Sequence, residues 1–410
     1  MTIISALLVF LCFALADFTD PPCVLELECR ECVPEYAPLV TSHSAVNGSV
    51  VAAAGDELVL ACAGGKFLAY PLLGAVRAVC EAGRYRVRHD GTLRHLLELG
   101  CQENIFEDVL HQVEGCQPPL QGRSYQMHEP AQDAVRHIAT VCFDEDRATA
   151  VRLHMTGAAG NRLAAPRHGH RAAPLSILGN FNHMFDARTR HDADMLYSDD
   201  VRMNRRVHEA FKHDRFSFAG QTLTSAKLLS GHYFEDQNMR VSEFVSNRVA
   251  VWGSVAAGNL RHVHRDVAGF LQASRARGAV DVYAGTHGTL SLRAGAARAE
   301  LFLKAGARFP VPRYVWTVLH APAQRKAVAL ILLNDPFVAV SEIRDAVLCE
   351  SACARLAWLR ELRRQRNYEV PLYGLVFCCS LEHLVAVVPE MPRALVNVTA
   401  GSDGLLTDFF

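Results

Sequence analysis

The sequence has little that would mark an integral membrane protein or a strongly charged one. Beyond the first residues, no stretch reaches the roughly 18 uninterrupted apolar residues that a membrane-spanning helix needs. The 42 Lys and Arg residues nearly balance the 43 Asp and Glu residues, so the formal net charge is only −1. The chain is therefore predicted to have no membrane span, and it lacks the basic excess of a dedicated nucleic-acid-binding protein.

Cysteine is missing from the middle of the chain, between Cys142 and Cys349. The early group is Cys23, Cys29, Cys32, Cys62, Cys80, Cys101, Cys116 and Cys142, and the late group is Cys349, Cys353, Cys378 and Cys379. Their even number predicts a disulfide framework in two separate regions, with pairings that the sequence does not give. The spacing of Cys29 and Cys32 also fits zinc or a redox pair, but export from the cell favours disulfides.

Residues 1–16 have the features of a signal peptide. The apolar run Ile3–Phe13 is too short to cross a bilayer, and it leads into the small-x-small pattern Ala14–Ala16. No basic side chain precedes the run, and a buried N-terminal strand is the alternative interpretation. We therefore expect a secreted protein, in which the sequons at Asn47 and Asn397 are acceptors for N-glycosylation.

The remaining chain is long enough for two domains, and its hydrophobic content of 50% supports sizeable cores. Residues 17–130 combine short apolar runs with frequent glycines, which predicts a small cysteine-rich β module. Residues 131–410 mix strand-like and helix-like patterns, so the predicted fold class is α+β. The elements expected there are strands around residues 138–144, from Arg240, from Val280 and over 327–333, and helices near residues 192–218, from the N-cap Asn259 to Gly278 and over 349–365.

Several phrases in this second region resemble, in their order, the DNA/RNA non-specific endonuclease family, and in particular its secreted insect-type double-stranded ribonucleases. The phrases are Val141–Asp144, Asn247–Asn259, Val282–Gly288, Val311–Trp316, Asn334–Phe337 and Tyr373–Cys379. The likeness covers roughly residues 138–395 and extends more loosely into the cysteine-rich part. No single phrase is specific, and it is their joint order that carries the resemblance.

The resemblance implies a ββα-metal core, in which a strand-helix unit binds one hydrated Mg²⁺ beside a general-base histidine. Mg²⁺ keeps most of its waters and needs only one or two protein oxygens, so an asparagine carbonyl can serve as the ligand. A neutral imidazole takes the proton of the attacking water, and the metal stabilises charge on the phosphate and on the leaving oxygen.

In a gapless alignment, Asn247 keeps its family spacing but the reactive side chains are replaced. The general base falls on Ala226, the metal-binding asparagine on Ala256 and the helical glutamate on His264. Because base and metal act on one transition state, their joint loss is expected to remove most of the metal-dependent rate. This alignment implies a catalytically inactive homologue.

A competing alignment retains catalysis. It takes His232 as the general base, at the cost of about six deleted residues, and makes Asn259 or Asn247 the metal ligand. The alternative for His232 is an ordinary loop histidine. Arg240, Arg248 and His264 are the candidate nucleic-acid contacts, although His264 also fits a half-buried structural role.

Three functional hypotheses follow. The first is a secreted, inactive nuclease homologue that at most binds nucleic acid. The second is an active Mg²⁺-dependent nuclease that uses His232. The third is a protein that binds a protein partner and uses the fold as a scaffold. The basic run that begins at Arg360 is either a nucleic-acid contact or ordinary compensation of a helix dipole.

Overall fold

The computed structural model describes residues 20–409, except for residues 28, 46–48, 63–64, 104, 130–133, 158–186, 212–219, 276–277, 295–296, 366–367, 392–394 and 396–403. The expected signal peptide and the sequon residues Asn47 and Asn397 lie outside the described residues. Within the described part of the chain, no helix has the length and apolar character needed to cross a membrane.

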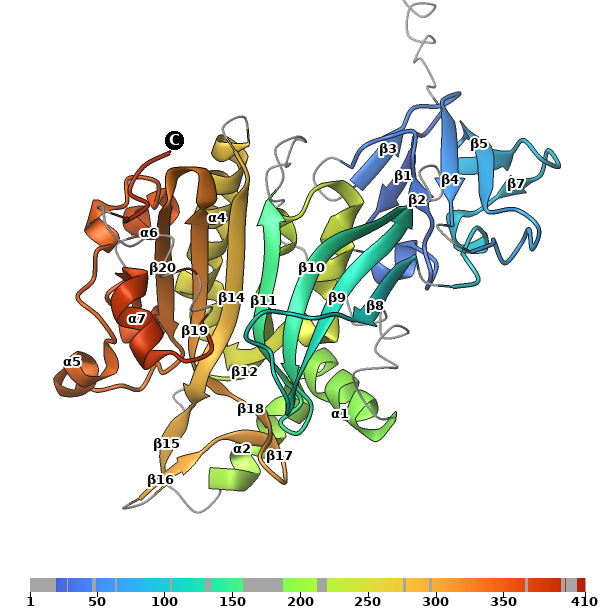
Figure 1. Ribbon diagram of the computed structural model, residues 1–410. Helices are drawn as coiled ribbons and strands as arrows, with labels where there is room; N and C mark the ends of the chain where they lie inside the picture. Colours follow the sequence, from blue (N-terminus) through green and yellow to red (C-terminus); the bar gives the residue numbers. More distant parts are fainter. Residues whose placement is uncertain are drawn as a thin grey trace, which may run out of the picture.

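The N-terminal region is a small β module, drawn in blue in Figure 1. Its strands are β1 (Cys23–Glu26), β2 (Leu39–Val40), β3 (Ser49–Ala52), β4 (Glu57–Ala61), β5 (Ala75–Glu81), β6 (Arg84–Val87) and β7 (Leu93–Arg94). A five-stranded sheet has the order β2-β4-β5-β6-β7, and β1 pairs with β3. In β5 and β6, buried and exposed residues alternate, as expected for a sheet with one face toward the core.

The large region is built on an eight-stranded sheet of order β21-β20-β19-β14-β11-β10-β9-β8, in which every neighbouring pair is antiparallel. Its strands are β8 (Phe106–Leu110), β9 (Leu120–Glu129), β10 (Ala134–Asp144), β11 (Thr149–Gly157), β14 (Val280–Thr289), β19 (Pro312–Ala321), β20 (Lys326–Leu333) and β21 (Val376–Cys379). The predicted domain boundary at residue 130 stays a prediction. The eight-stranded sheet already includes β8, which begins at Phe106.

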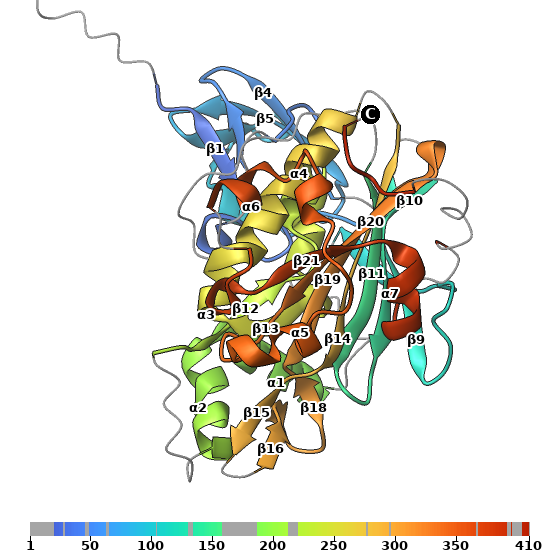
Figure 2. The same cartoon turned by 90° about the vertical axis from the view of Figure 1, so that its left-hand side faces the viewer.

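Helices cover both faces of this sheet, which confirms the predicted α+β class. The helices are α1 (Ala187–Ser198), α2 (Asp200–Phe211), α3 (Gly253–Val255), α4 (Arg261–Ser274), α5 (Ile343–Ala346), α6 (Arg360–Gln365) and α7 (Leu381–Val387). The core on the α4 face includes Val267 and Phe270, and the core on the α7 face includes Leu384 and Trp316. Figure 2 shows α4 and α6 side by side over the sheet. Because both faces are covered, β20 is an almost continuous apolar run.

Four short strands extend the large region away from the β module (Figure 1). They form two hairpins, β15 (Ser291–Ala294) with β16 (Ala297–Glu300) and β17 (Phe302–Lys304) with β18 (Arg308–Pro310). A further antiparallel pair joins β12 (Leu223–Lys227) to β13 (Arg248–Trp252). β13 leads directly into α3 and α4, and the pair carries Ala226 and Arg248, while the other candidate residues lie in the segments that join or follow the two strands.

Two predicted elements are wrong in their extent. The strand expected from Arg240 starts only at Arg248, because two 3-10 helices, Asp236–Glu243 and Val245–Asn247, precede it. The helix expected over residues 349–365 is reduced to a 3-10 turn, Cys353–Arg355, and to α6. There, disulfides to β21 hold the chain in a loop, so the first two cysteines of the segment do not share a helical turn. The other predicted strands and helices are confirmed within a few residues where the structure describes them. The predicted N-cap is wrong, because Asn259 lies in the turn before α4 and bonds Gly374 instead of capping the helix. The helix expected near residues 192–218 is divided into α1 and α2, and its residues 212–218 lie outside the described residues.

The disulfides fall into the two predicted groups. The pairs are Cys23–Cys80, Cys29–Cys32, Cys62–Cys101 and Cys116–Cys142 in the early group, and Cys349–Cys379 and Cys353–Cys378 in the late group. Cys29 and Cys32 bond to each other, which confirms the disulfide interpretation. Cys116–Cys142 ties the segment before β9 to β10, so this bond belongs to the large sheet.

Candidate functional site

The candidate site lies on a β-β-α unit formed by β12, β13 and α4 (Figure 2). Ala226 pairs with Val249 and Lys227 pairs with Arg248 across the two strands. After β13 the chain passes through α3 and a wide helical turn, Ala256–Leu260, into α4. The order strand, strand, helix is the one that the family resemblance implies, and the side chains on it decide what it can do.

Both alanine positions are half-buried. Ala226 lies near the end of β12, and Ala256 begins the wide turn before α4. A methyl group can neither take a proton nor coordinate a cation, so any chemistry at this unit depends on the neighbouring side chains.

Asn247 is committed to the backbone. Its side chain is 1% exposed. The Nδ2 group donates to the carbonyl oxygens of Leu229, at 2.8 Å, and Ser242, at 2.7 Å, while Oδ1 accepts from the Leu229 N–H at 2.8 Å. These three bonds hold the 3-10 segment against the end of β12, and they satisfy a polar group that would be costly to bury unpaired.

Next to Asn247 lies a buried ion cluster, defined by Lys227, Glu243 and Arg248. Lys227 Nζ and Arg248 Nη2 donate to different oxygens of the Glu243 carboxylate, the latter at 2.5 Å. The side chain of Arg248 is 2% exposed and that of Glu243 is 7% exposed. Burial lowers the pKa of Arg248, and the charge of Glu243 acts in the opposite direction. Arg248 is therefore not placed where a nucleic acid could reach it.

His264 is held on both ring nitrogens. Nε2 lies 3.2 Å from the carbonyl oxygen of Lys227, which can only accept, so Nε2 carries the proton. Nδ1 then accepts from the hydroxyl of Tyr233 at 2.7 Å. The pKa of His264 is lowered to about 4, mainly by burial and in smaller part by the charges of His232 and Lys227, while the bond to the Lys227 carbonyl acts in the opposite direction. The ring is neutral at pH 7 and spends both nitrogens on protein contacts.

His232 lies in the 3-10 turn Gly231–Tyr233 and is half-buried. Its backbone N–H donates to Ser230 Oγ at 3.4 Å, and it is one of the residues that lower the pKa of His264. The structure thus brings His232 to the same end of β12 as His264, whereas the side chain of Asn247 is directed to backbone groups.

The turn that carries Ala256 is covered by the segment Pro371–Gly374. Asn259 is fully buried, and its Nδ2 donates to the carbonyl oxygen of Gly374 at 2.7 Å. A Cβ on Gly258 would meet the carbonyl oxygen of Tyr373 at 2.9 Å, so only glycine permits this approach. Gly258 and Asn259 therefore face a packed backbone segment.

Arg240 joins the two regions of the protein. It is 7% exposed, and its Nη1 and Nη2 both donate to the carbonyl oxygen of Ala37 at 3.1 Å. Its guanidinium also lies 5.3 Å from the ring centroid of Phe106, and burial lowers its pKa to about 10. The amide of Gln237 makes two further bonds to the backbone of Val40. Arg240 is therefore buried at the contact between the two regions. In that position its guanidinium does not fit the role of a nucleic-acid contact.

Mg²⁺ does not fit this arrangement. Among the described residues, the only group of three His, Cys, Asp or Glu side chains close enough to share a metal is Glu26, Cys29 and Cys32, and its two cysteines form a disulfide. At the β-β-α unit, the Glu243 carboxylate is already bound by two cations. A hard divalent ion would have to displace them to gain an oxygen ligand.

Sequence reasoning missed the ion cluster. Lys227 and Glu243 lie in or beside the segments that carried the resemblance, but only the β12–β13 pairing brings them together. The available signal was the presence of charged residues within otherwise apolar phrases, since such residues are rarely buried unless they are paired.

Comparison with known proteins adds little. No protein-family model matches the chain, and no curated protein matches it. Among solved structures, the chain is similar to a chain in the crystal structure of the EndoG/EndoGI complex, described as giving the mechanism of EndoG inhibition. That similarity has a TM-score of 0.29 at 10% sequence identity, and it covers 48% of this chain and 72% of the other. A score of this size does not establish a common fold or function.

Proposed function

We propose that this protein is a secreted, disulfide-bonded relative of the DNA/RNA non-specific endonucleases that does not hydrolyse phosphodiester bonds and binds nucleic acid without cutting it. The family assignment rests on the ordered phrases in the sequence. Secretion is supported by six disulfides, which persist in oxidising compartments.

The observation that carries the loss of catalysis is that three polar side chains of the β-β-α unit, Asn247, Glu243 and His264, are already bound to other protein groups. Asn247 binds three backbone groups, Glu243 is neutralised by two cations, and His264 has a partner on each ring nitrogen. Metal-assisted hydrolysis needs an oxygen ligand and a base that can exchange a proton with water. None of these three groups can take either role without breaking the packing around it.

The rival proposal keeps His232 as the base, and its half-buried position leaves it partly open to solvent. The two proposals differ in one assay. Purified protein is incubated with plasmid DNA or double-stranded RNA, with Mg²⁺ and then with EDTA, and strand breaks are followed on gels.

We expect no cleavage above that of a mock purification. Cleavage that requires Mg²⁺, is lost in His232→Ala and is kept in the matched variant His43→Ala would overturn the proposal. His43 is a half-buried histidine of the β module, so this control removes an imidazole elsewhere in the protein.

A further inference from the structure

Positive charge gathers where α6 packs beside α4. The two helices carry five arginines, Arg261, Arg265, Arg360, Arg363 and Arg364, against two carboxylates, Asp266 and Glu361, which is a net charge of +3. The whole chain has a net charge of −1. Basic side chains are therefore concentrated on this part of the surface, far above the average of the molecule.

The two carboxylates that α4 and α6 themselves carry already have partners. Asp266 is buried and accepts from the backbone N–H groups of Arg360, Glu361 and Leu362, at 2.9, 2.8 and 2.9 Å, so it caps α6. Glu361 is shared, at 2.8 Å from Arg364 and 3.9 Å from Arg265. Among the residues that the structure describes, no carboxylate pairs with Arg363.

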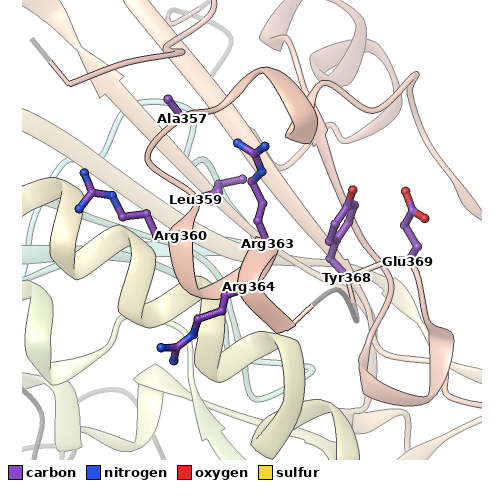
Figure 3. Close-up of a pocket in the computed structure, with 7 residues that line it drawn as sticks. All are labelled: Ala357, Leu359, Arg360, Arg363, Arg364, Tyr368 and Glu369. Atoms are coloured by element: carbon purple, nitrogen blue, oxygen red, sulfur yellow. The ribbon is translucent and has the colours of Figure 1, made fainter.

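A hollow of about 650 Å³ opens beside α6. Its lining residues are Ala357, Leu359, Arg360, Arg363, Arg364, Tyr368 and Glu369. In Figure 3, Arg363, Tyr368 and Glu369 extend to the same side, while Arg360 and Arg364 extend to the other. One side of the hollow thus presents the Arg363 guanidinium beside the half-buried ring of Tyr368 and the carboxylate of Glu369, and the other edge carries Arg360 and Arg364. Guanidinium groups near an aromatic ring are the combination that binds an anionic backbone and a flat base.

The pKa of the neighbouring His262 is lowered in part by the same positive charges. His262 is buried on α4, and burial is the largest cause that lowers its pKa. Arg261, Arg265 and Arg364 lower it further, and only Glu361 opposes them. The arginines therefore act together on one small region, in addition to their individual contacts.

We propose that this arginine surface, defined by Arg360, Arg363, Arg364 and Tyr368, binds single-stranded nucleic acid. The guanidinium groups contact about three consecutive phosphates, and a base stacks on Tyr368. The proposal rests on the proposed function, because it locates the nucleic-acid contact that a non-cutting nuclease relative needs. It moves that contact from the β-β-α unit to α6.

The test measures binding by fluorescence anisotropy, with a labelled oligo-dT of about 16 nucleotides and with EDTA present. Salt is varied from about 50 to 200 mM NaCl. Three phosphate contacts predict a slope of log K against log salt of about −2, since each contact on a single strand contributes about −0.7. In the double variant Arg363→Gln/Arg364→Gln the slope falls to about −0.7.

A matched control removes the same charge elsewhere. Arg77→Gln/Arg88→Gln alters two arginines of the β module, whose side chains are 69% and 64% exposed, as Arg364 is 67% exposed. We expect this control to keep the wild-type slope. Tyr368→Leu, which retains the apolar packing, is expected to weaken binding about tenfold with the slope unchanged.

Three results would overturn the inference. The first is equal loss in both double variants. The second is wild-type affinity in Tyr368→Leu together with equally tight binding of a charge-matched heparin fragment, which would assign the surface to sulfated polysaccharide. The third is no binding by the wild type, which removes the nucleic-acid contact but leaves the absence of cleavage intact. Because EDTA is present, a failure of the inactivity proposal appears separately, as Mg²⁺-dependent strand breaks in the gel assay.

Discussion

The buried ion cluster and the arginine surface use similar side chains in opposite surroundings. In the cluster, Glu243 is bound by two cations, and the side chain of Arg248 is only 2% exposed. On the arginine surface, Arg364 is 67% exposed, and Arg363 has no carboxylate partner among the described residues. Burial of a charge in protein is tolerated only with a partner, whereas an exposed charge costs nothing to leave available. The cluster therefore maintains the fold, and the surface is open to a ligand.

The difference between the buried cluster and the exposed surface predicts that the largest loss of stability follows a substitution of Glu243. Glu243→Gln leaves Lys227 and Arg248 without their counter-charge, and Arg248 cannot move to water. We expect the free energy of unfolding, measured by urea denaturation, to fall by about 3–5 kcal/mol, the range for removing one partner of a buried ion pair.

The β module supplies a matched control for this change. Glu57 also binds two arginines, Arg77 at 3.4 Å and Arg88 at 3.3 Å, but its side chain is 37% exposed. Glu57→Gln is expected to cost less than about 1 kcal/mol. Equal losses in the two variants would show that burial does not separate the two kinds of charge pair.

Asn247 tests whether the β-β-α unit keeps a relic of metal binding. Asn247→Asp preserves an oxygen ligand but removes the donors to Leu229 and Ser242, and it places a carboxylate against two carbonyl oxygens. We expect a loss of about 2–4 kcal/mol in the free energy of unfolding, because buried groups are left without partners. A metal-ligand role predicts instead an intact fold and tighter Mg²⁺ binding, measured by calorimetry.

A half-buried asparagine, Asn238, serves as the control for Asn247. Asn238 accepts a hydrogen bond from Arg136 at 3.3 Å, and an aspartate can accept the same bond. Asn238→Asp is therefore expected to change stability by no more than about 0.5 kcal/mol.

Much of the fold could be predicted because its signals are local. The run at β20 and the apolar face of α4 are periodic and long, so pattern alone places them. The 3-10 helices before β13 could not be placed in this way. They depend on side chains such as Gln237, Arg240 and Asn247 that bond to backbone groups distant in sequence or in another region.

The candidate site divides in the same way. The sequence itself shows that residues 226 and 256 are alanines. Once the alignment is chosen, it predicts that these two positions carry no reactive side chain. The burial of Arg240 and Arg248 cannot be predicted from the sequence, because the sequence does not distinguish an arginine that binds phosphate from one that binds a buried protein group. The packing of Pro371–Gly374 against the turn before α4 is likewise a contact between distant segments.

His264 gives a pH dependence to the β-β-α unit. Its pKa in the fold is about 4, below the ordinary value of 6.5, so the unfolded chain binds the proton first as the pH falls. The stability that the neutral ring supports is complete above pH 6.5 and is lost toward pH 4. We expect the wild type to lose about 2 kcal/mol more than His264→Gln between these limits, measured by urea unfolding. A constant difference between the free energies of unfolding of the two proteins across that range would contradict a ring that stays neutral in the fold.

The smallest effect on stability is expected on the arginine surface. Arg363 is exposed and has no carboxylate partner among the described residues, so Arg363→Gln should change the free energy of unfolding by less than about 0.5 kcal/mol. The same variant should make the salt slope of oligonucleotide binding less steep by about 0.7, the share of one phosphate on a single strand. Arg77→Gln, with an exposed side chain that pairs with Glu57, should leave the salt slope unchanged. If Arg363→Gln instead lowered stability by more than about 1 kcal/mol, the arginine would be part of the packing. That result would contradict the distinction between a buried cluster that stabilises the fold and an arginine surface that is available to a ligand.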